Sequence, residues 1–593
     1  MLVDFLHVRG SDMRLFSMVI AVLTTSALAA CGGGGGGGMD PIVPITPPPS
    51  NSSITNLTVS QTFNAVGNNQ QAVFDLRNGT VVSASGSSAN LQVAYDAALK
   101  SYTVFVNGES ATFRPSDQKS NIQGEAKYEQ RSADGAQLLT LVTTPYSSSI
   151  SNRYVGMGYW QRFLSADGRQ NDRFSTFVYG LDTPASAMPR TGTARYNIDV
   201  FGVTAAPGYE PVVYQGDGSF DVDFLGGEFA AHSYLQETAL LTGQGIVGGG
   251  IEMAASGRLS SGDGSFSGYA TVGSFNANTA GTISGRFFGP GSEEVGASFS
   301  TSNADGATAV RSFTGQRDGA AGVNLRMTDI AVPQVFYASG RALLVDRASP
   351  SNVVHSVSQI PLVGQFNDRT NGNFSFGPGL SSMAGGNFTA ADIVTGDDPN
   401  FVHYAKTFGA QDVKMQLYKL GSSNAELALT YVGLGRWASQ VNNPGSVEFQ
   451  RHHFVYGLAT RDSMLTRRTG SARYEGVVYG AGANRTTGAM YDVGGTSSFD
   501  VDFSKQAYTG ALVLNSKASG QMLDFGRYEF GGRLFWNGNT GSILEGDAEI
   551  GQISTRFYGP TGEELAGDFH IYAPERVQTG GLVINGVTVA RRQ

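Results

Sequence analysis

The chain has 593 residues, of which 40% are hydrophobic and only 15% are charged, and its formal net charge is −9. This acidic balance argues against a nucleic-acid-binding protein, which would carry a basic patch or stripe. The 80 glycines argue against a mostly helical protein because glycine disfavours helix interiors, and their lack of a three-residue period excludes collagen.

The first thirty residues predict a secretory signal peptide. A short basic start at Met13-Arg14 precedes an apolar run that is too short to span a membrane. The run ends in Leu-Ala-Ala-Cys at Cys31, which resembles the cleavage and acylation motif of bacterial lipoproteins. We therefore expect residues 1–30 to be removed and Cys31 to carry lipid, including palmitate. Two aspartates before Met13 are unusual in a signal, so Met13 is an alternative start to Met1.

The residues after the cysteine, up to position 50, predict a tether. Seven consecutive glycines, 32–38, give a flexible segment, and the prolines of 41–49 give a stiffer, extended one. A phosphate-binding loop is the alternative interpretation of the glycines, but no strand precedes them and no Lys-Ser/Thr follows. The arrangement is that of a lipid anchor holding a folded body away from a membrane surface.

The body of the chain contains an internal duplication. The segment Phe177–Leu181 recurs identically at Phe454–Leu458, and Ser219–Phe224 recurs identically at Ser498–Phe503. Three further pairs follow the same order: Tyr154–Gly158 with Tyr431–Gly435, Arg190–Tyr196 with Arg468–Tyr474, and Phe287–Glu294 with Phe557–Glu564. Collinear matches of this kind predict two homologous lobes, 51–320 and 321–593, each with its own core.

Within each lobe the hydrophobic period is two, which is the period of a β-strand. Phe220, Val222 and Phe224 alternate with aspartates, and Phe499, Val501 and Phe503 repeat the pattern. Short runs of this type recur between Gly, Asn and Asp clusters, which is typical of antiparallel barrels and sandwiches. We expect a nearly all-β fold without long helices, in which these six residues face a core.

Paired acidic residues and histidines were considered as catalytic or metal-binding groups. Glu293-Glu294 and Glu563-Glu564 suggest a glycosidase pair, but neighbours on a strand point to opposite faces, so a turn or barrel-rim role is favoured. Adjacent His452 and His453 would also diverge, which favours a rim or surface role over haem or metal binding. No catalytic elbow, zinc motif or dinucleotide fingerprint is present. We expect no enzyme activity, no cofactor and no metal.

The repeated closing motif Phe-Tyr/Phe-Gly-Pro…Glu-Glu, the two lobes, the lipidation motif and the glycine tether together resemble the transferrin-binding protein B family. More broadly, they resemble surface lipoproteins that share its β-barrel domain. The resemblance implies that each lobe pairs a β-rich handle domain with an eight-stranded antiparallel barrel. The handles would be 51–150 and 321–429, and the barrels 151–320 and 430–593. It also implies an outer-membrane, cell-surface protein that works with a TonB-dependent receptor.

The function suggested by this resemblance is capture of an iron- or haem-carrier-like protein or nutrient, with transfer to the receptor and a role in iron uptake. Two alternatives remain: an adhesin or host-factor-binding protein, and an envelope structural lipoprotein without a solute. Because identical cores cannot encode one partner, the loops that differ between the lobes are the candidate binding segments. These are Val203–Gly218 and Gly480–Thr496. We expect their aromatic residues Tyr209, Tyr214 and Tyr491 to be exposed and, with Arg485, to be the candidate contact residues. Tolerant turns without a binding role are the simpler explanation of these loops.

Overall fold

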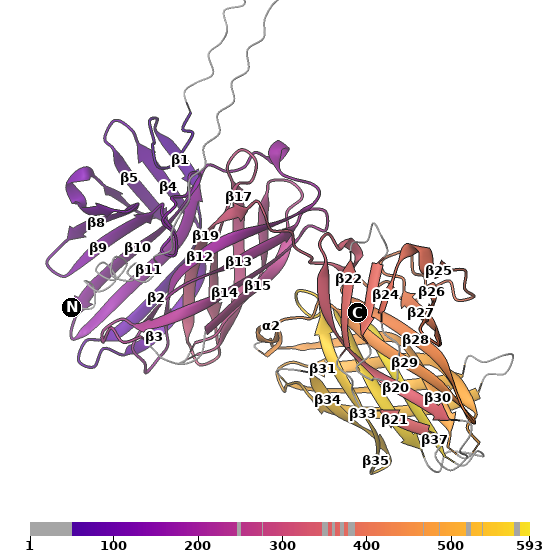
Figure 1. The fold of residues 1–593 in the computed structure, drawn as a ribbon. Coiled ribbons are helices and arrows are strands. Elements are labelled where there is room, and N and C mark those ends of the chain that lie inside the picture. The colour runs from indigo at the N-terminus through magenta and orange to yellow at the C-terminus, as the bar shows by residue number, and fades with distance from the viewer. Residues whose placement is uncertain are drawn as a thin grey trace, which may run out of the picture.

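The structure is a computed structural model in which two β-rich lobes lie next to each other (Figure 1). It describes residues 50–245, 251–274, 277–346, 354–357, 362–367, 373–377, 386–466, 468–485, 487–516, 523–535, 538–573 and 581–593. The predicted signal peptide, Cys31 and all of the tether except residue 50 lie outside these residues. Among the described residues, no helix is long and apolar enough to cross a membrane.

The N-lobe handle consists of two antiparallel sheets that enclose an apolar core (Figure 1). The smaller sheet has the order β1-β4-β5-β6 and comprises Gln61–Asn64, Leu91–Asp96, Ser101–Val106 and Glu109–Phe113. The larger has the order β3-β2-β11-β10-β9-β8-β7, with β2 Val66–Asp75, β3 Val81–Ala89, β7 Gln118–Ile122, β8 Glu125–Arg131, β9 Gly135–Val142, β10 Val155–Ala166 and β11 Arg169–Gly180.

The N-lobe barrel is closed by eight antiparallel strands, β12 to β19, as the resemblance implied. The strands are β12 Thr193–Ala205, β13 Val212–Asp223, β14 Glu228–Ala239, β15 Ile251–Leu259, β16 Ser265–Val272, β17 Thr279–Phe288, β18 Glu294–Ser302 and β19 Thr308–Asp318. Pairing of β12 with β19 closes the barrel, so it has no free sheet edge.

The C-lobe repeats this plan with one ten-stranded handle sheet and a second closed barrel of eight strands. The handle strands are β20 Gln334–Asp346, β21 Val354–Val357, β22 Leu362–Asn367, β23 Asn373–Gly377, β24 Gly386–Phe388, β25 Ile393–Val394, β26 Phe401–Phe408, β27 Gln411–Tyr418, β28 Val432–Asn443 and β29 Ser446–Gly457. The barrel strands are β30 Ser471–Asn484, β31 Met490–Asp502, β32 Ala507–Ser516, β33 Leu523–Arg533, β34 Asn539–Glu545, β35 Ala548–Tyr558, β36 Glu564–Ala573 and β37 Leu582–Arg592.

The strand pairing moves the predicted boundary between handle and barrel. In the N-lobe, β10 and β11 pair with handle strands β9 and β2, so the barrel begins at Thr193 and not at 151. In the C-lobe, β28 and β29 pair with β27 and β20, so the barrel begins at Ser471 and not at 430. Sequence alone could not place these hairpins because hairpins of both domains have the same period of two.

Helical structure is slight in the described residues. It consists of α2, Asp462–Thr466, and 3₁₀ turns at Pro115–Asp117, Ala185–Ala187, Met327–Asp329 and Ala390–Asp392. Helix α2 lies against β15 and β16 of the other lobe. The lobes also meet where the Tyr431 hydroxyl donates a 2.7 Å hydrogen bond to Glu228.

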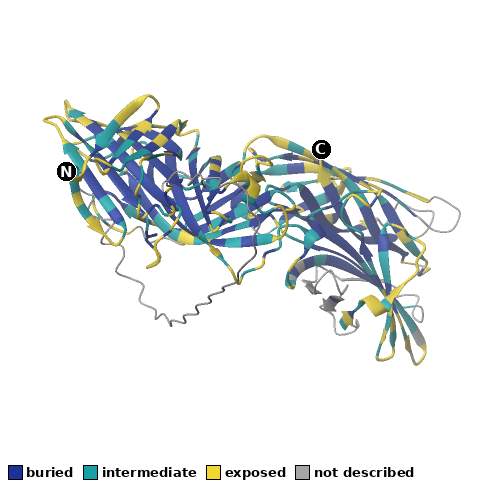
Figure 2. Cartoon of the chain, turned by 90° about the horizontal axis from the view of Figure 1, so that it is seen from above, coloured by how far each residue is buried: buried dark blue, intermediate teal, exposed yellow. Residues whose placement is uncertain are grey.

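Each barrel is filled by the alternating side chains that the sequence singled out. Figure 2 shows that most residues along the strands of both lobes are buried. Phe220 and Val222 are fully buried and Phe224 is nearly so, and their repeats Phe499, Val501 and Phe503 are buried as well. The Phe220 ring packs 5.1 Å from Phe229 and 4.9 Å from Phe266, measured between ring centroids. The predicted inward orientation of these repeated residues is confirmed.

The repeated Glu-Glu pairs form the joint between handle and barrel. Glu294, the first residue of β18, accepts hydrogen bonds from the backbone N–H groups of Arg153, Tyr154 and Val155, where β10 begins. Glu564 accepts the same three bonds from Thr430, Tyr431 and Val432 in the C-lobe. The preceding residues, Glu293 and Glu563, each bind a backbone N–H of their own turn. The favoured turn and barrel-rim role is therefore observed in both lobes.

Candidate functional site

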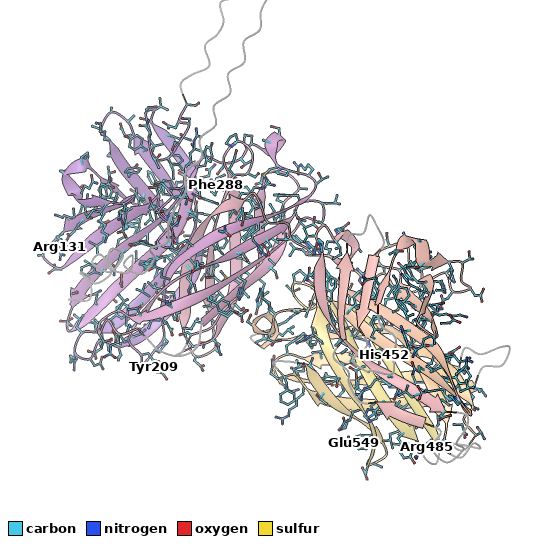
Figure 3. The ribbon with its side chains drawn as sticks, viewed as in Figure 1. Arg131, Tyr209, Phe288, His452, Arg485 and Glu549 are labelled. Carbon is cyan, nitrogen blue, oxygen red and sulfur yellow. The ribbon has the colours of Figure 1, made fainter. Side chains whose placement is uncertain are left out.

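The N-lobe handle contains a concavity of about 940 Å³, which we call the cleft. It is lined by β2, β3 and β8 to β11 of the larger sheet and by the start of β6 from the smaller sheet. Its volume lies in the range of small-molecule binding sites. Figure 3 shows Arg131, one of its lining residues, at the outer end of this handle.

A row of polar side chains crosses the floor of the cleft at right angles to the strands. Strand register places its members directly opposite one another on six consecutive strands, and alternation turns them to the same face. The row, called the polar row below, consists of Ser85, Gln71, Arg173, Arg162, Gln137 and Gln130. Amides, a hydroxyl and guanidinium groups therefore face one cavity.

Two arginines are direct neighbours in the middle of the polar row. Arg162 on β10 pairs in register with Arg173 on β11, and like charges placed opposite each other on a sheet are unfavourable. Glu109 of β6 relieves this repulsion, because one of its oxygens binds Arg162 and the other binds Arg173. The hydrogen bond from Arg173 and the charges of both arginines hold the Glu109 pKa below its ordinary value.

The deeper part of the cleft contains donors without an acceptor. The Arg162 guanidinium lies over the Trp160 ring, with its central carbon 3.9 Å from the ring centroid. Trp160 is 1% exposed, and its Nε1–H, like Arg162 Nε–H, has no hydrogen-bond partner in the structure. Buried donors are normally satisfied, so two open ones beside an arginine pair mark a place for an acceptor group.

The charged centre of the cleft belongs to one lobe only. Phe177–Leu181 and Phe454–Leu458 align Arg162 with Ser439 and Arg173 with Gln450, and these two residues also pair in register. Ser439 and Gln450 are buried and uncharged. Trp160, by contrast, is repeated as Trp437. The scaffold is therefore shared between the lobes, whereas the arginine pair is specific to the N-lobe.

A buried carboxyl lies on the opposite face of the same hairpin. Asp172 of β11 accepts a 2.7 Å hydrogen bond from the Gln161 amide. Burial raises the pKa of Asp172 from 3.8 to about 7. Burial likewise raises the pKa of Asp199 to about 6 and that of Glu564 to about 7.

The raised pKa of Asp172 predicts that this carboxyl contributes more to the stability of the fold in acid than at neutral pH. The unfolded chain ionises Asp172 near its ordinary value, so between the two pKa values the folded state binds more protons. The stabilising contribution is thus complete below about pH 4 and is lost as the pH rises through about 7. The melting temperature of the parent minus that of Asp172→Asn, measured from about pH 4 to pH 8, should decrease as the pH rises, because the variant lacks this titrating group. Superimposable profiles would contradict the assignment to Asp172.

The four residues predicted to contact a ligand do not form one site. Tyr209 is 50% exposed in the turn after β12, whereas Tyr214 is fully buried inside the N-lobe barrel. Its hydroxyl donates to Glu237 and its ring lies under Arg311, so its predicted exposure is wrong. The cause is that β12 and β13 occupy most of the supposed loop, and alternation turns Tyr214 inward.

The corresponding C-lobe segment is also mostly strand, β30 and β31. Arg485 is exposed at its turn and donates a 2.6 Å hydrogen bond to the Tyr572 hydroxyl. Tyr491 is half-buried, with its ring 5.6 Å from that of Phe525. Figure 3 shows Tyr209 and Arg485 on different lobes. Ligand binding by these residues stays a prediction.

The adjacent histidines diverge as predicted, but they are buried and do not lie at a rim or surface. His452 is completely buried and its ring packs 5.9 Å from that of Phe454, while His453 is 5% exposed. Burial lowers the pKa of His452 to about 3, so it is neutral at physiological pH. Within the described ranges, no cluster of three or more His, Cys, Asp or Glu side chains could hold a metal ion.

The sequence did not predict the cleft because its residues come from seven strands of two sheets. One signal could have indicated it. Within the well-matched hairpins of the two lobes, Arg162 and Arg173 are charged where the repeat has Ser439 and Gln450. A search for charge differences at strand positions, and not only in loops, would have found the pair.

Comparison with known proteins supports the resemblance seen in the motifs. Residues 467–592 match the family described as the C-lobe and N-lobe beta barrels of Tf-binding protein B. Transferrin-binding protein B of Haemophilus influenzae is 27% identical over 192 residues, which cover 30% of this chain and 29% of that protein. Neisserial heparin binding antigen of Neisseria meningitidis serogroup B is 32% identical over 128 residues, 22% of this chain and 24% of that protein. The chain thus matches less than a third of the length of these relatives.

Among solved structures, the intact Ap-TbpB with N and C lobes is 15% identical, with a TM-score of 0.27 and coverage of 89% of this chain and 95% of that one. TbpB isotype 1 of Neisseria meningitidis serogroup B is 16% identical, with a TM-score of 0.25 and coverage of 75% and 86%. The assignment of the fold stands on the strand pairing described above. The matched family is one of binding proteins, in agreement with the expectation of a non-enzymatic chain. The chain is thus a two-lobed protein whose C-terminal barrel, residues 467–592, is similar to the family of C-lobe and N-lobe beta barrels of Tf-binding protein B.

Proposed function

We propose that this protein is a lipid-anchored receptor on the cell surface of the outer membrane that captures a ligand in the cleft of its N-lobe handle. The ligand is an iron- or haem-carrier-like protein or another nutrient, which is handed to a TonB-dependent outer-membrane receptor. The observation that carries the proposal is the arginine pair, Arg162 and Arg173, which only one of two homologous lobes possesses.

In a binding protein built by duplication, the two lobes share a scaffold, and specific recognition depends on residues that differ between them. The arginine pair in the N-lobe handle is such a difference. The repeated residues fill the cores and make the handle–barrel joints, so they cannot distinguish one partner from another. The cleft combines a concave shape, open donors and opposed charges, which are the features of a binding site. The motif at Cys31 and the tether supply the attachment that a surface receptor needs.

The second candidate is an adhesin or host-factor-binding lipoprotein without a role in uptake. The likeness to Neisserial heparin binding antigen favours it, because that protein's name describes binding and no transport. The two candidates differ in their need for a TonB-dependent receptor. Loss of the receptor gene would abolish nutrient-dependent growth in the first case and leave surface binding unchanged in the second.

Anchoring depends on Cys31 in this proposal. Cells that express the wild type should incorporate labelled palmitate into the protein, and Cys31→Ser should abolish the label because the acylated thiol is missing. The variant should also leave the membrane fraction. Label or membrane association in Cys31→Ser would contradict lipidation at this residue.

Ligand capture is tested by pull-down with the mature protein fixed at its N-terminal tether. Iron-loaded and haem-loaded carrier proteins are offered to the wild type, to an Arg162→Gln/Arg173→Gln double variant and to Arg473→Gln. Arg473 is the matched control because it is an exposed arginine of the C-lobe barrel that pairs with Asp500 of the same barrel, away from the cleft. Capture by the wild type and by the control, with loss in the double variant, is expected. Equal capture by all three would remove the cleft from the proposal.

A further inference from the structure

The Glu109 carboxylate binds the arginine pair in the way that a carboxylate of a bound ligand would. Glu109 begins β6, directly after the Asn107-Gly108 turn, and half of its side chain is exposed. It reaches from the smaller sheet across the cleft and gives one carboxylate oxygen to each arginine of the larger sheet. A carboxylate between two guanidinium groups is a strong, charge-assisted arrangement.

The surroundings of this carboxylate indicate what a true ligand would have to offer. The Trp160 and Arg162 N–H groups without partners need an acceptor, which an anionic group can provide. The amides of Gln71 and Gln137 and the Ser85 hydroxyl can both donate and accept, as sugar hydroxyls do. The amide nitrogen of Gln130, at the end of the row, already donates to the Thr112 carbonyl and to Asp117. At the spacing of neighbouring strands the polar row extends over roughly 24 Å, which suits several linked residues of a ligand.

Other ligand classes fit the polar row less well. A protein that bound the row through its own side chains would usually rely on aromatic and aliphatic anchors in pockets, whereas the row itself contains no apolar side chain. A carrier protein would therefore bind the row through an attached glycan. A long polyanion would be repelled by a chain with a net charge of −9. A short ligand with one acidic group at the arginine pair and hydroxyls along the row meets both conditions.

We propose that the polar row binds a short acidic saccharide, one carboxylate of which displaces Glu109 from Arg162 and Arg173. This inference rests on the proposed function, because it names the ligand class of the same cleft. Glu109 then acts as an internal competitor that neutralises the arginine pair until a ligand arrives. The C-lobe, with Ser439 and Gln450 at the corresponding positions, does not bind such a saccharide.

The test is calorimetric titration of the mature protein with three probes. These are a tetrasaccharide of galacturonic acid, the same tetrasaccharide with its carboxylates reduced to alcohols, and a tetrapeptide of glutamate. The acidic saccharide should bind, and Glu109→Gln should strengthen its binding about tenfold because the competing carboxylate loses its charge. Arg162→Gln and Arg173→Gln should each weaken binding at least about tenfold, while Arg473→Gln should leave it unchanged.

A carboxylate of this kind can belong to a free saccharide or to the glycan of a glycoprotein. A sialylated glycoprotein, offered before and after removal of its sialic acid, distinguishes the two sources. Binding of the tetrasaccharide alone supports a free saccharide, and binding of the glycoprotein that is lost with its sialic acid supports a glycan. Binding of neither probe by the wild type or Glu109→Gln at millimolar concentration overturns the proposal.

Three other results also overturn the inference. They are equal binding of the neutral saccharide, preference for the glutamate peptide, and unchanged binding in both arginine variants. The gain expected from Glu109→Gln keeps the test decisive even where an arginine variant unfolds. A failure here leaves capture of a carrier protein in the pull-down untouched, so the two proposals can fail separately.

Discussion

Replacement of Phe220 by alanine is expected to lower the free energy of unfolding of the N-lobe by about 3–5 kcal/mol. The ring is fully buried in the barrel and contacts two further phenylalanines, Phe229 and Phe266. Its removal costs both the transfer of the ring into the core and the cavity that remains. Calorimetry of the mature chain should show the N-lobe transition lowered by about 2–4 °C per kcal/mol.

Leu225→Ala is the matched control for this prediction. Leu225 lies two residues after the end of β13 and is 61% exposed, so its truncation should change the stability by no more than about 0.5 kcal/mol. The repeat offers a second check, since Phe499→Ala should affect the C-lobe transition instead. A Phe220→Ala protein that melts like the parent would show that the barrel is not filled as described.

Replacement of Glu564 by alanine is expected to destabilise the C-lobe by about 3–5 kcal/mol. Glu564 is 2% exposed and accepts three backbone N–H groups at the start of β28. Without the carboxylate these buried donors lose their acceptor, which is more costly than losing an exposed contact. Thermal unfolding of the mature chain measures the effect, and hydrogen exchange at residues 430–432 should rise sharply.

Glu549→Ala tests whether the effect is specific to the joint. Glu549 lies exposed on β35 of the same barrel, where it binds the Ser542 hydroxyl and the Gln552 amide (Figure 3). Its loss should cost less than about 1 kcal/mol. If Glu564→Ala is no more harmful than Glu549→Ala, the repeated glutamate does not hold the handle to the barrel.

Sequence alone was sufficient for the parts of this protein that depend on local order. The alternation of Phe220, Val222 and Phe224 determines a strand with one buried face, because successive side chains point to opposite sides. The collinear repeats determine two lobes with the same architecture, since equal patterns bury equal cores. The lipidation motif ending at Cys31 and the following tether are also read from the linear chain, but they lie outside the described residues and stay predictions.

Only the tertiary structure shows which side chains face the barrel interior and which residues of different strands meet, because both depend on strand register and on closure of the barrel. Tyr214 lies in a segment that differs between the lobes, yet its place on a barrel strand turns its side chain inward. Likewise, only the pairing with β9 and β2 assigns strands β10 and β11 to the handle. Arg162 and Arg173 are separated along the chain by a hairpin, and Glu109 comes from another sheet, so no sequence window contains all three. They meet because hydrogen bonding between strands fixes which residues face each other.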